Sequence, residues 1–462
     1  MLPAIATLAG PAILSFILQN AYHINDAWFL GKVGASASNA MGLFMMVSIA
    51  NFGFILVLAR GTQSLVGRRL GGRDAGGAFG ALAQGLGMAA RIAVPLAAIE
   101  WYFAPELLQL MGGEGETVVQ GTAYLRTLFL FMPAMFFSPL VEFSLQGLGD
   151  TRTPFRLQCV AVCVNFVLNA ALVLDQLTIP AGWPGGGTTV PLAGLGVMGA
   201  AIATGSSRTV SALLGFLVLV RRDRGRPLVQ WPSYRIDRRV AGEILRVGVP
   251  AGAATLLYAV VSMGLLKIIG QVGGQDAYGA YGIGFRGVES ISFMIVLGLG
   301  VGTSTVVSHA VGAGDDARAR RAGHVGVGLG VGAMLLTTTI FLSMPARLAG
   351  IYTSDAEIIS IAVTYIVAMA WCQVPQAFEM IYSEAMAGAG SSMRTAALTI
   401  PGNVVRLPLA WFLAVHLELG LWGVWWAVIA SAVFKGLAVT ALYLSGSWEK
   451  AMWKGREALE AA

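Results

Sequence analysis

The two halves of this sequence match each other, and this internal repeat restricts the fold more than any other feature. The segment RGTQSLVGRRLGGRDA, residues 60–75, aligns with VGTSTVVSHAVGAGDD, residues 301–316, so that glycine, threonine and aspartate positions coincide. Pro11 aligns with Pro250 upstream, and QGLGDTRT aligns further on with AGAGSSMRT, with one inserted residue. The shared residues, mainly Gly, Pro and loop Asp, are explained by helix packing and turns. The repeat therefore predicts two copies of one structural unit.

Long apolar segments recur through both halves. Each has about 20 residues or more, the length that crosses a bilayer as a helix, whereas barrel strands would alternate every second residue. With 56% hydrophobic and 12% charged residues, the chain has too little polar surface to cover a soluble globule. The predicted fold class is an all-α integral membrane protein with twelve transmembrane helices. We expect the helices at 2–30, 40–65, 78–103, 118–145, 157–174, 192–220, 244–272, 277–310, 325–344, 358–387, 398–416 and 421–444.

The twelve helices divide into an N-terminal six-helix lobe (1–222), a linker loop (223–240), a C-terminal six-helix lobe (241–446) and a tail (447–462). Each repeat holds an even number of helices, so both insert with the same orientation and are parallel repeats. Arginines concentrate in the loops after even-numbered helices, so the positive-inside rule places both termini in the cytoplasm. The net charge of +6 resides in these loops and gives no nucleic-acid signal. We expect a multi-pass protein of the inner or plasma membrane without a cleavable signal peptide.

Asp26 is the most informative single residue, because it lies within the first apolar segment. An ionised Asp deep in a spanning helix costs roughly 2.5–3.5 kcal/mol, so it needs a partner or a water-filled cavity. Gln19, His23 and Asp26 follow at i, i+4 and i+7, which predicts one polar face that looks inward. The matching position in the second half, near Leu265, is apolar. Asp26 is therefore a functional candidate, and the alternative is a structural acid near the membrane interface.

Five motifs together resemble the multidrug and toxic compound extrusion (MATE) family of the MOP flippase superfamily, in its prokaryotic NorM-like and DinF-like forms. They are DAWFLGKVG, GLGDTRTP, NFVLN, GVMGAAIAT and VGAGD. The resemblance covers nearly the whole chain in the correct order. It implies twelve helices in two six-helix lobes, and export of cationic, amphiphilic compounds driven by inward flow of protons or sodium.

The resemblance also implies residues of an ion-coupling site in the first lobe. It makes Asp26 the acid of helix one and Asn165 the asparagine of helix five, with Thr204 in helix six. Asn169 stands where the DinF-like branch has a second Asp. Pro11 matches the helix-one proline that has been proposed as a bend point, so it is the hinge candidate.

The second lobe departs from the NorM-like pattern of the family. In that branch two acids, in helices seven and ten, form a cation site, but here the first position is Tyr258 and the second falls near Gln376. A sodium site of that type is therefore in doubt. Arg286 and Glu289, at i and i+3, are expected to pair with each other or to be functional.

Two further acids offer an alternative second-lobe site. Glu379 and Glu384 lie on predicted helix ten, and Lys267 lies on predicted helix seven. The alternative interpretation of these two acids is that they form a buried ion pair with Lys267 or Arg406. Aromatic residues stack on organic cations, although helix packing explains most of them. The residues that we predict for the substrate cavity are Gln19, Tyr258, Trp371, Glu379 and Glu384.

Asp26 could couple an ion to a substrate without any second acid. Burial favours the neutral form of a carboxyl group, so a proton and a cation can compete for one site, and mutual exclusion suffices for antiport. Asn165 and Asn169 could donate to the carboxylate or coordinate sodium through their carbonyl oxygens, or simply join helices by hydrogen bonds. His23 could tune or share the proton of Asp26, or be a structural histidine.

The predicted function is a secondary active antiporter that exports organic cations or drugs by alternating access, in exchange for protons or alternatively sodium. We expect no cofactor and no structural metal, with Na⁺ at Asp26 as the alternative ion. The expected partners are small cationic amphiphiles and the lipid bilayer, and the protein is expected to be a monomer. A lipid-linked precursor flippase of the same superfamily and a channel are the alternatives, although few intramembrane basic residues and no filter-like re-entrant segment count against them. No HExxH, paired-Asp or GxSxG motif indicates an enzyme.

Overall fold

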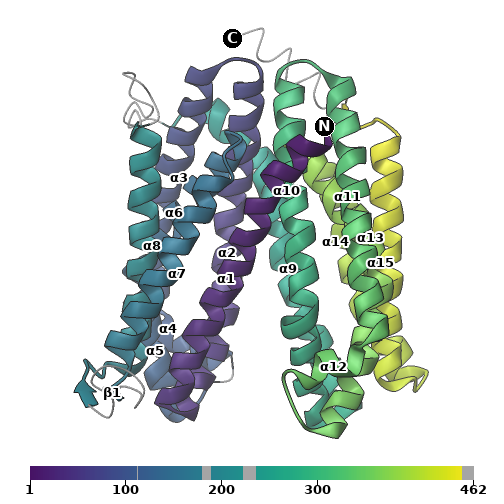
Figure 1. The fold of residues 1–462 in the computed structure, drawn as a ribbon. Coiled ribbons are helices and arrows are strands. Elements are labelled where there is room, and N and C mark those ends of the chain that lie inside the picture. The colour runs from purple at the N-terminus through teal and green to yellow at the C-terminus, as the bar shows by residue number, and fades with distance from the viewer. Residues whose placement is uncertain (112, 179–188, 222–235, 450–462) are drawn as a thin grey trace.

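The computed structural model describes residues 1–111, 113–178, 189–221 and 236–449, without the side chains of 35, 36, 38–46 and 286. Most of the predicted linker (223–240) and tail (447–462) lies outside these residues. Figure 1 shows two groups of helices, one from each half of the chain, that lie close together at one end and diverge toward the other.

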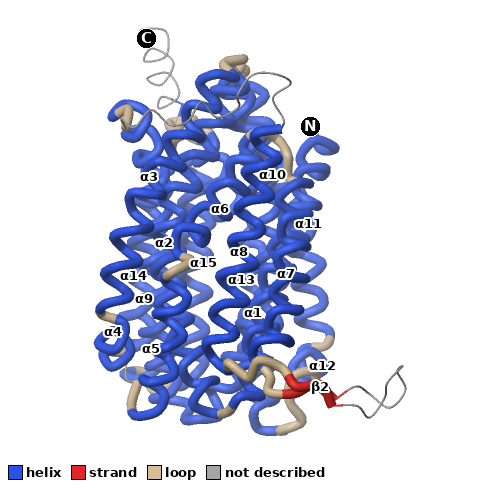
Figure 2. Tube along the Cα trace, turned by 90° about the vertical axis from the view of Figure 1, so that its left-hand side faces the viewer, coloured by secondary structure: helices blue, strands red, loops and turns tan. Residues whose placement is uncertain are grey.

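The described helices follow the repeat. The first half contains α1 (Leu2–Val33), α2 (Ala35–Gly71), α3 (Ala75–Tyr102), α4 (Ala104–Leu110), α5 (Gly115–Phe129), α6 (Met132–Gly147), α7 (Arg152–Val173) and α8 (Gly196–Arg221). The second half contains α9 (Arg238–Gly282), the π-helix η1 (Ile283–Glu289), α10 (Ser290–Gly312), α11 (Asp316–Ser343), α12 (Pro345–Gly350), α13 (Ala356–Gly388), α14 (Ser392–Trp411), the π-helix η2 (Phe412–His416) and α15 (Gly420–Leu444). The short strands β1 (Gln176–Thr178) and β2 (Thr189–Pro191) pair antiparallel at one end of the bundle (Figure 2).

The described residues contain ten runs of helix that are long and apolar enough to cross a membrane, and the bent pair α5 and α6 makes an eleventh span. One run, Arg238–Gly312, has 75 residues, whereas about 20 suffice for a bilayer. It breaks at Gly274, where φ is 69°. The start of α9 packs against α2 at Gly61, and the end of α10 packs against the same helix at Gly71, so this run begins and ends at one end of the bundle and crosses twice. The twelve predicted spans are thereby confirmed.

The fourth span is not the single straight helix that we expected over 118–145. Helices α5 and α6 meet at an angle of 58°. Pro133 lies in the first turn of α6, and because proline has no backbone N–H it cannot continue the hydrogen bonding of α5. The kink therefore has a local cause in the sequence.

The two repeats meet at their most similar segments. A side chain at Gly71, near the end of α2, would collide with the backbone of His309 in α10, and one at Gly312 would collide with the backbone of Arg68. Glycine at these two positions is what permits such close approach of the helices. The predicted packing role of the shared glycines is confirmed here.

The aspartates shared by the two repeats cap helices. The Asp74 carboxylate accepts a hydrogen bond from the Gly77 backbone N–H at 2.7 Å at the start of α3, and Asp315 accepts from the Arg318 backbone N–H at 2.9 Å at the start of α11. Such N-caps satisfy backbone groups that would otherwise lack partners. These two acids are therefore structural, as expected of residues that the scaffold needs twice.

Helix α1 connects the cores of the two lobes. Phe29, near its end, packs in the core of the first lobe, whereas Ile5 and Ala9 pack in the core of the second lobe with residues of α10. Figure 1 shows α1 crossing obliquely between the two groups of helices. Pro11 lies next to this crossing, α1 remains helical through it, and the Ser15 hydroxyl donates to the Pro11 carbonyl at 2.9 Å. The predicted hinge thus lies where the helix changes lobes.

Polar contacts join the lobes at the end that carries the α2–α3 and α10–α11 turns. Arg60 Nη1 in α2 donates to Glu384 Oε2 in α13 at 2.8 Å, and these side chains are only 10% and 17% exposed. One turn further along α2, the Ser64 hydroxyl donates to the Ala387 carbonyl at 2.7 Å. The lobes are therefore fastened at this end, while the ribbons diverge at the other (Figure 1).

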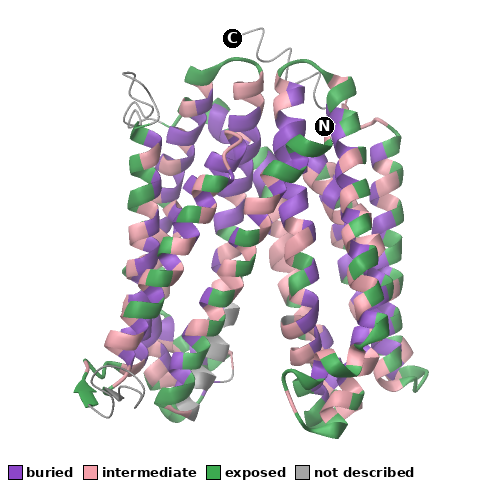
Figure 3. Cartoon of the chain, viewed as in Figure 1, coloured by how far each residue is buried: buried purple, intermediate pink, exposed green. Residues whose placement is uncertain are grey.

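Apolar side chains are exposed along many helices, among them Leu213, Leu336 and Leu437. Exposed positions recur along the outer helices, and buried positions concentrate inside each group and where the groups meet (Figure 3). Monomeric soluble proteins rarely expose so much contiguous apolar surface. Contact with lipid chains accounts for it.

Candidate functional site

Asp26 lies in the first lobe and receives hydrogen bonds from two other helices. Asn165 Nδ2 and Asn169 Nδ2, both in α7, donate to Asp26 Oδ1 at 3.0 and 2.7 Å. Thr204 Oγ1, in α8, donates to Asp26 Oδ2 at 2.9 Å. The Asp26 side chain is 2% exposed. The structure thus brings together four of the five residues that were predicted for ion coupling.

The partners of Asp26 are all neutral donors, an arrangement that suits an ionised carboxylate, since that group can only accept hydrogen bonds. The ion pairs of the described residues all lie elsewhere. In the described part of the chain, no three His, Cys, Asp or Glu residues are grouped as a metal site would require. A buried carboxylate without a direct ion pair is costly unless it binds a proton or a cation. Asp26 is therefore suited to exchange one for the other.

The two asparagines differ in how firmly their amides are held. Asn25 Nδ2 donates to Asn165 Oδ1 at 2.7 Å, which fixes the orientation of the Asn165 amide. Asn169 Oδ1, in contrast, is buried without a partner. Rotation of the Asn169 amide would turn this oxygen toward Asp26, where it could accept a hydrogen bond from the protonated carboxyl group or coordinate a cation. Asn169 is thus the adaptable neighbour of the acid.

Replacing Thr204 by Val, which removes the hydroxyl donor and keeps the shape, is expected to slow the predicted ion-coupled transport about tenfold, because a hydrogen bond to a charged group contributes roughly 1.5 kcal/mol or more. The measurement is the initial transport rate in proteoliposomes with an imposed pH gradient. Thr204→Ser retains the donor and is the control, expected to stay within about twofold of the wild type. Equal rates for the two variants would contradict the role of the hydroxyl.

Asp26 adjoins a cavity of about 280 Å³ between α1, α2, α6, α7 and α8. Gln19 and His23 also line it, so the predicted inward face of α1 is confirmed. His23 forms no described hydrogen bond with Asp26, and its ring packs edge-on against Tyr22 at 5.9 Å between centroids. The volume is near the lower end, roughly 300 Å³, of sites for small organic molecules. The large apolar side chains in the lining are Phe16, Ile49, Phe52, Ile55, Met132, Met135 and Phe143.

Two charged residues of this cavity escaped the sequence reasoning. Glu142 in α6 accepts a hydrogen bond from the Ser138 hydroxyl at 2.9 Å. Arg208 in α8 donates from Nη1 to Gln158 Oε1 at 3.3 Å, and its guanidinium carbon lies 4.7 Å from the Tyr22 ring centroid. Each of these residues is a charge inside an apolar segment. The argument that made Asp26 a functional candidate, the cost of a charge within the membrane, could therefore have identified them as well.

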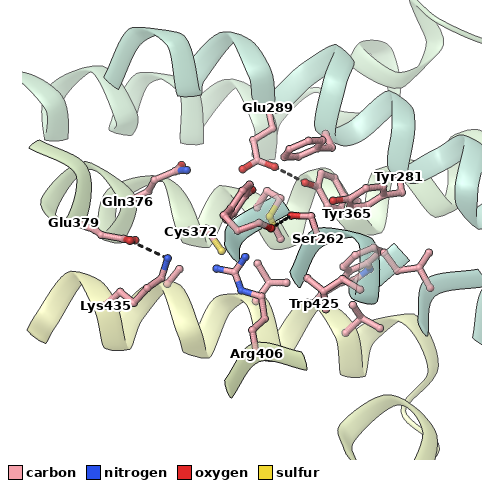
Figure 4. Close-up of a pocket in the computed structure, with 18 residues that line it drawn as sticks. Ser262, Tyr281, Glu289, Tyr365, Cys372, Gln376, Glu379, Arg406, Trp425 and Lys435 are labelled. Atoms are coloured by element: carbon pink, nitrogen blue, oxygen red, sulfur yellow. Dashed lines mark hydrogen bonds and ion pairs between the residues drawn. The ribbon is translucent and has the colours of Figure 1, made fainter. Parts of the chain in front are cut away.

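A smaller cavity of about 70 Å³ lies within the second lobe, and Tyr258 lines it. Gln376 and Glu379 also line it (Figure 4). Glu379 Oε1 is paired with Lys435 Nζ of α15 at 2.9 Å. The predicted interpretation of Glu379 as a member of a buried ion pair is thus confirmed, but both predicted partners are wrong. Helix α15 packs against α13, which brings Lys435 to this acid from a segment that sequence reasoning had not connected with it.

Glu289, the last residue of η1, also lines this second cavity and accepts a hydrogen bond from the Tyr365 hydroxyl. Its predicted pairing with Arg286 involves a side chain outside the described residues. The Arg406 guanidinium points into the cavity (Figure 4), and its Nε donates to the Ser431 hydroxyl at 3.4 Å. With the ion pair above, the described lining holds two acids and two basic groups, so its charges balance.

Two residues predicted for the substrate cavity lie elsewhere. Trp371 is 65% exposed and lines neither of these cavities, because Cys372 and Gln376 occupy the inward face of α13 and Trp371 projects from another side of the helix. Glu384 forms the ion pair with Arg60 of the first lobe. Neither residue lines the first-lobe cavity or the second-lobe cavity.

Two parallel repeats of six membrane-spanning helices, each with a buried acid beside a cavity, are the architecture of a membrane transporter. The family model MatE matches residues 11–171 and 250–412, one block in each half. The chain therefore belongs to the MATE family of transporters.

Curated relatives match over nearly the whole chain. The probable multidrug resistance protein NorM of Thermotoga maritima is 28% identical, with 96% of this chain and 92% of the relative covered. The protein of the same name from Pseudomonas aeruginosa is 27% identical, with 98% and 89% covered. A solved structure described as the outward-facing conformation of a multidrug resistance MATE family transporter of the MOP superfamily has the same fold, with a TM-score of 0.87, 21% identity, and 97% of this chain and 96% of that chain covered.

Proposed function

We propose that this chain is a secondary active antiporter that exports organic cations, including drugs, in exchange for protons, with sodium as the alternative coupling ion. The observation that carries the proposal is Asp26, a carboxylate that is 2% exposed, is surrounded by neutral donors and adjoins the larger cavity. The names of the curated relatives support the export of drugs.

Competition at one acid supplies the coupling. The ionised form of Asp26 attracts an organic cation into the cavity, because electrostatic attraction is strong where water is excluded. The protonated carboxyl group is neutral and does not attract a cation, so binding of a proton and binding of a cation exclude each other. Release of one on each side of the membrane then gives exchange, provided that the cavity opens to the two sides in turn.

The joined end of the lobes supports alternating access. Opening there requires the contact between Arg60 and Glu384 to break, and the lobes to approach each other at the opposite end. Helix α1 carries Asp26 in one lobe and packs through Ile5 in the core of the other. Pro11, between them, is our proposed hinge, through which the state of the acid would influence the packing of the lobes.

We further propose that both termini face the cytoplasm of a cell whose plasma or inner membrane holds the protein as a monomer. Helix α1 begins, and α15 ends, at the end of the molecule where the α2–α3 turn lies (Figure 1). That turn follows Arg68 and Arg69 and contains Arg73, and the positive-inside rule assigns such basic turns to the cytoplasm. The lipid bilayer surrounds the exposed apolar side chains.

Transport measured in proteoliposomes with the pH gradient and the sodium gradient imposed separately tests the coupling ion. We expect efflux of an organic cation under the pH gradient alone, and a rate under the sodium gradient alone no higher than without any gradient. Efflux driven by sodium alone would overturn the preference for protons. Absence of efflux under both gradients would overturn the antiport proposal itself.

A further inference from the structure

The charges that line the larger cavity do not balance. Of the described residues in its lining, Asp26, Glu142 and Arg208 carry charge when His23 is neutral. They come from α1, α6 and α8, so they surround the cavity from three sides. With both acids ionised, the lining carries one net negative charge.

Arg208 is held in place without a direct ion pair. It is 8% exposed, and none of the ion pairs of the described residues includes it. Its guanidinium is positioned by Gln158 and by the ring of Tyr22. Its positive charge therefore contributes to the net charge of the lining, although no ion pair joins it to either acid.

The same cavity has polar atoms with no partner of their own. Asn51 Oδ1, Gln146 Oε1 and Gln158 Nε2 belong to lining residues, are buried and form no hydrogen bond in the described structure. Buried polar atoms are usually bonded to protein, water or ligand. They therefore supply hydrogen-bonding capacity for a ligand or for water within the cavity.

Two other charged residues lie close to the cavity but outside its lining. Arg60, whose guanidinium carbon lies 4.7 Å from the ring centroid of the lining residue Phe143, is neutralised by Glu384. Glu100 accepts a hydrogen bond from Asn51 at 3.1 Å but does not itself line the cavity. The lining that a ligand would contact directly thus holds two acids and one arginine.

We propose that Arg208 is a specificity-determining residue that restricts this cavity to organic cations carrying a single positive charge. The inference rests on the proposed transport of cations and deepens it. A monovalent cation neutralises the lining, whereas a divalent cation leaves one uncompensated positive charge in a place where burial of charge is costly. Without Arg208, the lining would carry two negative charges and would suit a divalent cation.

Binding of ethidium and propidium to the full-length purified protein tests this proposal, because the two dyes share a phenanthridinium ring and carry one and two positive charges. Fluorescence titration in detergent at pH 8 gives the Kd of each dye. We expect the wild type to prefer ethidium, and Arg208→Gln to shift the ratio of the two Kd values toward propidium by about tenfold or more, since a nearby unit charge acts strongly at low dielectric. Arg208→Lys keeps the charge and should keep the wild-type ratio.

Glu142→Gln alone provides a second arm that does not depend on the folding of Arg208→Gln. Glu142→Gln makes the lining neutral and should weaken ethidium binding about tenfold. The double variant Glu142→Gln with Arg208→Gln has the net charge of the wild type, so its ratio should return toward the wild-type value. A wild-type ratio in Arg208→Gln, unchanged ethidium binding in Glu142→Gln, or a double variant that behaves like Arg208→Gln alone would each overturn the inference.

Failure of the inference can be told from failure of the proposed function. If the wild type binds ethidium and Asp26→Asn abolishes this binding, the cation site stands, and the ratio in Arg208→Gln decides the inference alone. If the wild type binds neither dye, or Asp26→Asn binds ethidium as tightly as the wild type, the proposed cation site and the inference that rests on it both fail.

Discussion

Asp26→Asn is expected to abolish coupled efflux, with a fall of at least about 30-fold in transport rate. The substitution keeps the shape of the side chain but removes the charge, and losing one member of a buried charged contact costs about 2 kcal/mol or more. The new amide would also turn one NH₂ group toward Asn165, Asn169 or Thr204, all of which now donate to the carboxylate. The measurement is efflux of an organic cation from proteoliposomes under an imposed pH gradient.

The matched control is Asp276→Asn, the same substitution at an exposed position of α9. It should leave the rate within about twofold of the wild type, since exposed sites away from such features tolerate substitution. Both variants should elute as the wild type does in gel filtration. Wild-type efflux in Asp26→Asn would rule out Asp26 as the coupling acid.

Glu384→Gln is expected to weaken the joined end of the lobes. The substitution leaves Arg60 largely buried without its negative partner, and breaking a buried ion pair in this way costs about 3 kcal/mol. If the pair exists in only one of the two conformations, this energy changes their ratio by roughly 100-fold. Spin labels at Ala75→Cys and Ala317→Cys, at the starts of α3 and α11 in opposite lobes, should therefore report longer distances in a larger fraction of molecules.

Glu449→Gln removes the acid of another ion pair by the same substitution and serves as the control. Its partner Arg320 is 56% exposed, and both residues belong to the second half of the chain. Exposed pairs contribute about 0–1 kcal/mol, so the distance distribution should match that of the wild type. Identical distributions for all three proteins would show that the Arg60–Glu384 contact does not hold the lobes together.

Much of the fold could be predicted, because membrane insertion imposes strong and local rules. Apolar length predicts spans, and the repeat predicts their grouping, since similar sequences fold into similar units. Details set by local backbone chemistry were only partly anticipated. Pro133 bends the fourth span, and Gly274, with φ at 69°, separates two spans within what would otherwise be one helix.

The site divides in the same way. The spacing of Gln19, His23 and Asp26 on one helix is enough to predict a shared face, and the structure places all three at one cavity. Spacing along one helix carries no information about which other helix supplies a partner. The predicted ion-pair partners of Glu379 were therefore wrong, and Lys435 was overlooked although its Nζ lies 2.9 Å from the Glu379 carboxylate.

The sequence by itself determined that this protein crosses the membrane in two repeated units. It also determined that Asp26 is a functional candidate, because an ionised carboxylate is energetically unfavourable inside a spanning helix. Both conclusions follow from burial energies along one chain. Only the tertiary structure decided which groups surround each charge. It gave Asp26 three neutral donors, gave Glu384 an arginine from the other lobe, and placed Glu142 and Arg208 in the same cavity. The physical reason is that electrostatic and hydrogen-bonding partners are selected by distance in space, which the packing of helices sets and which no period along the chain encodes.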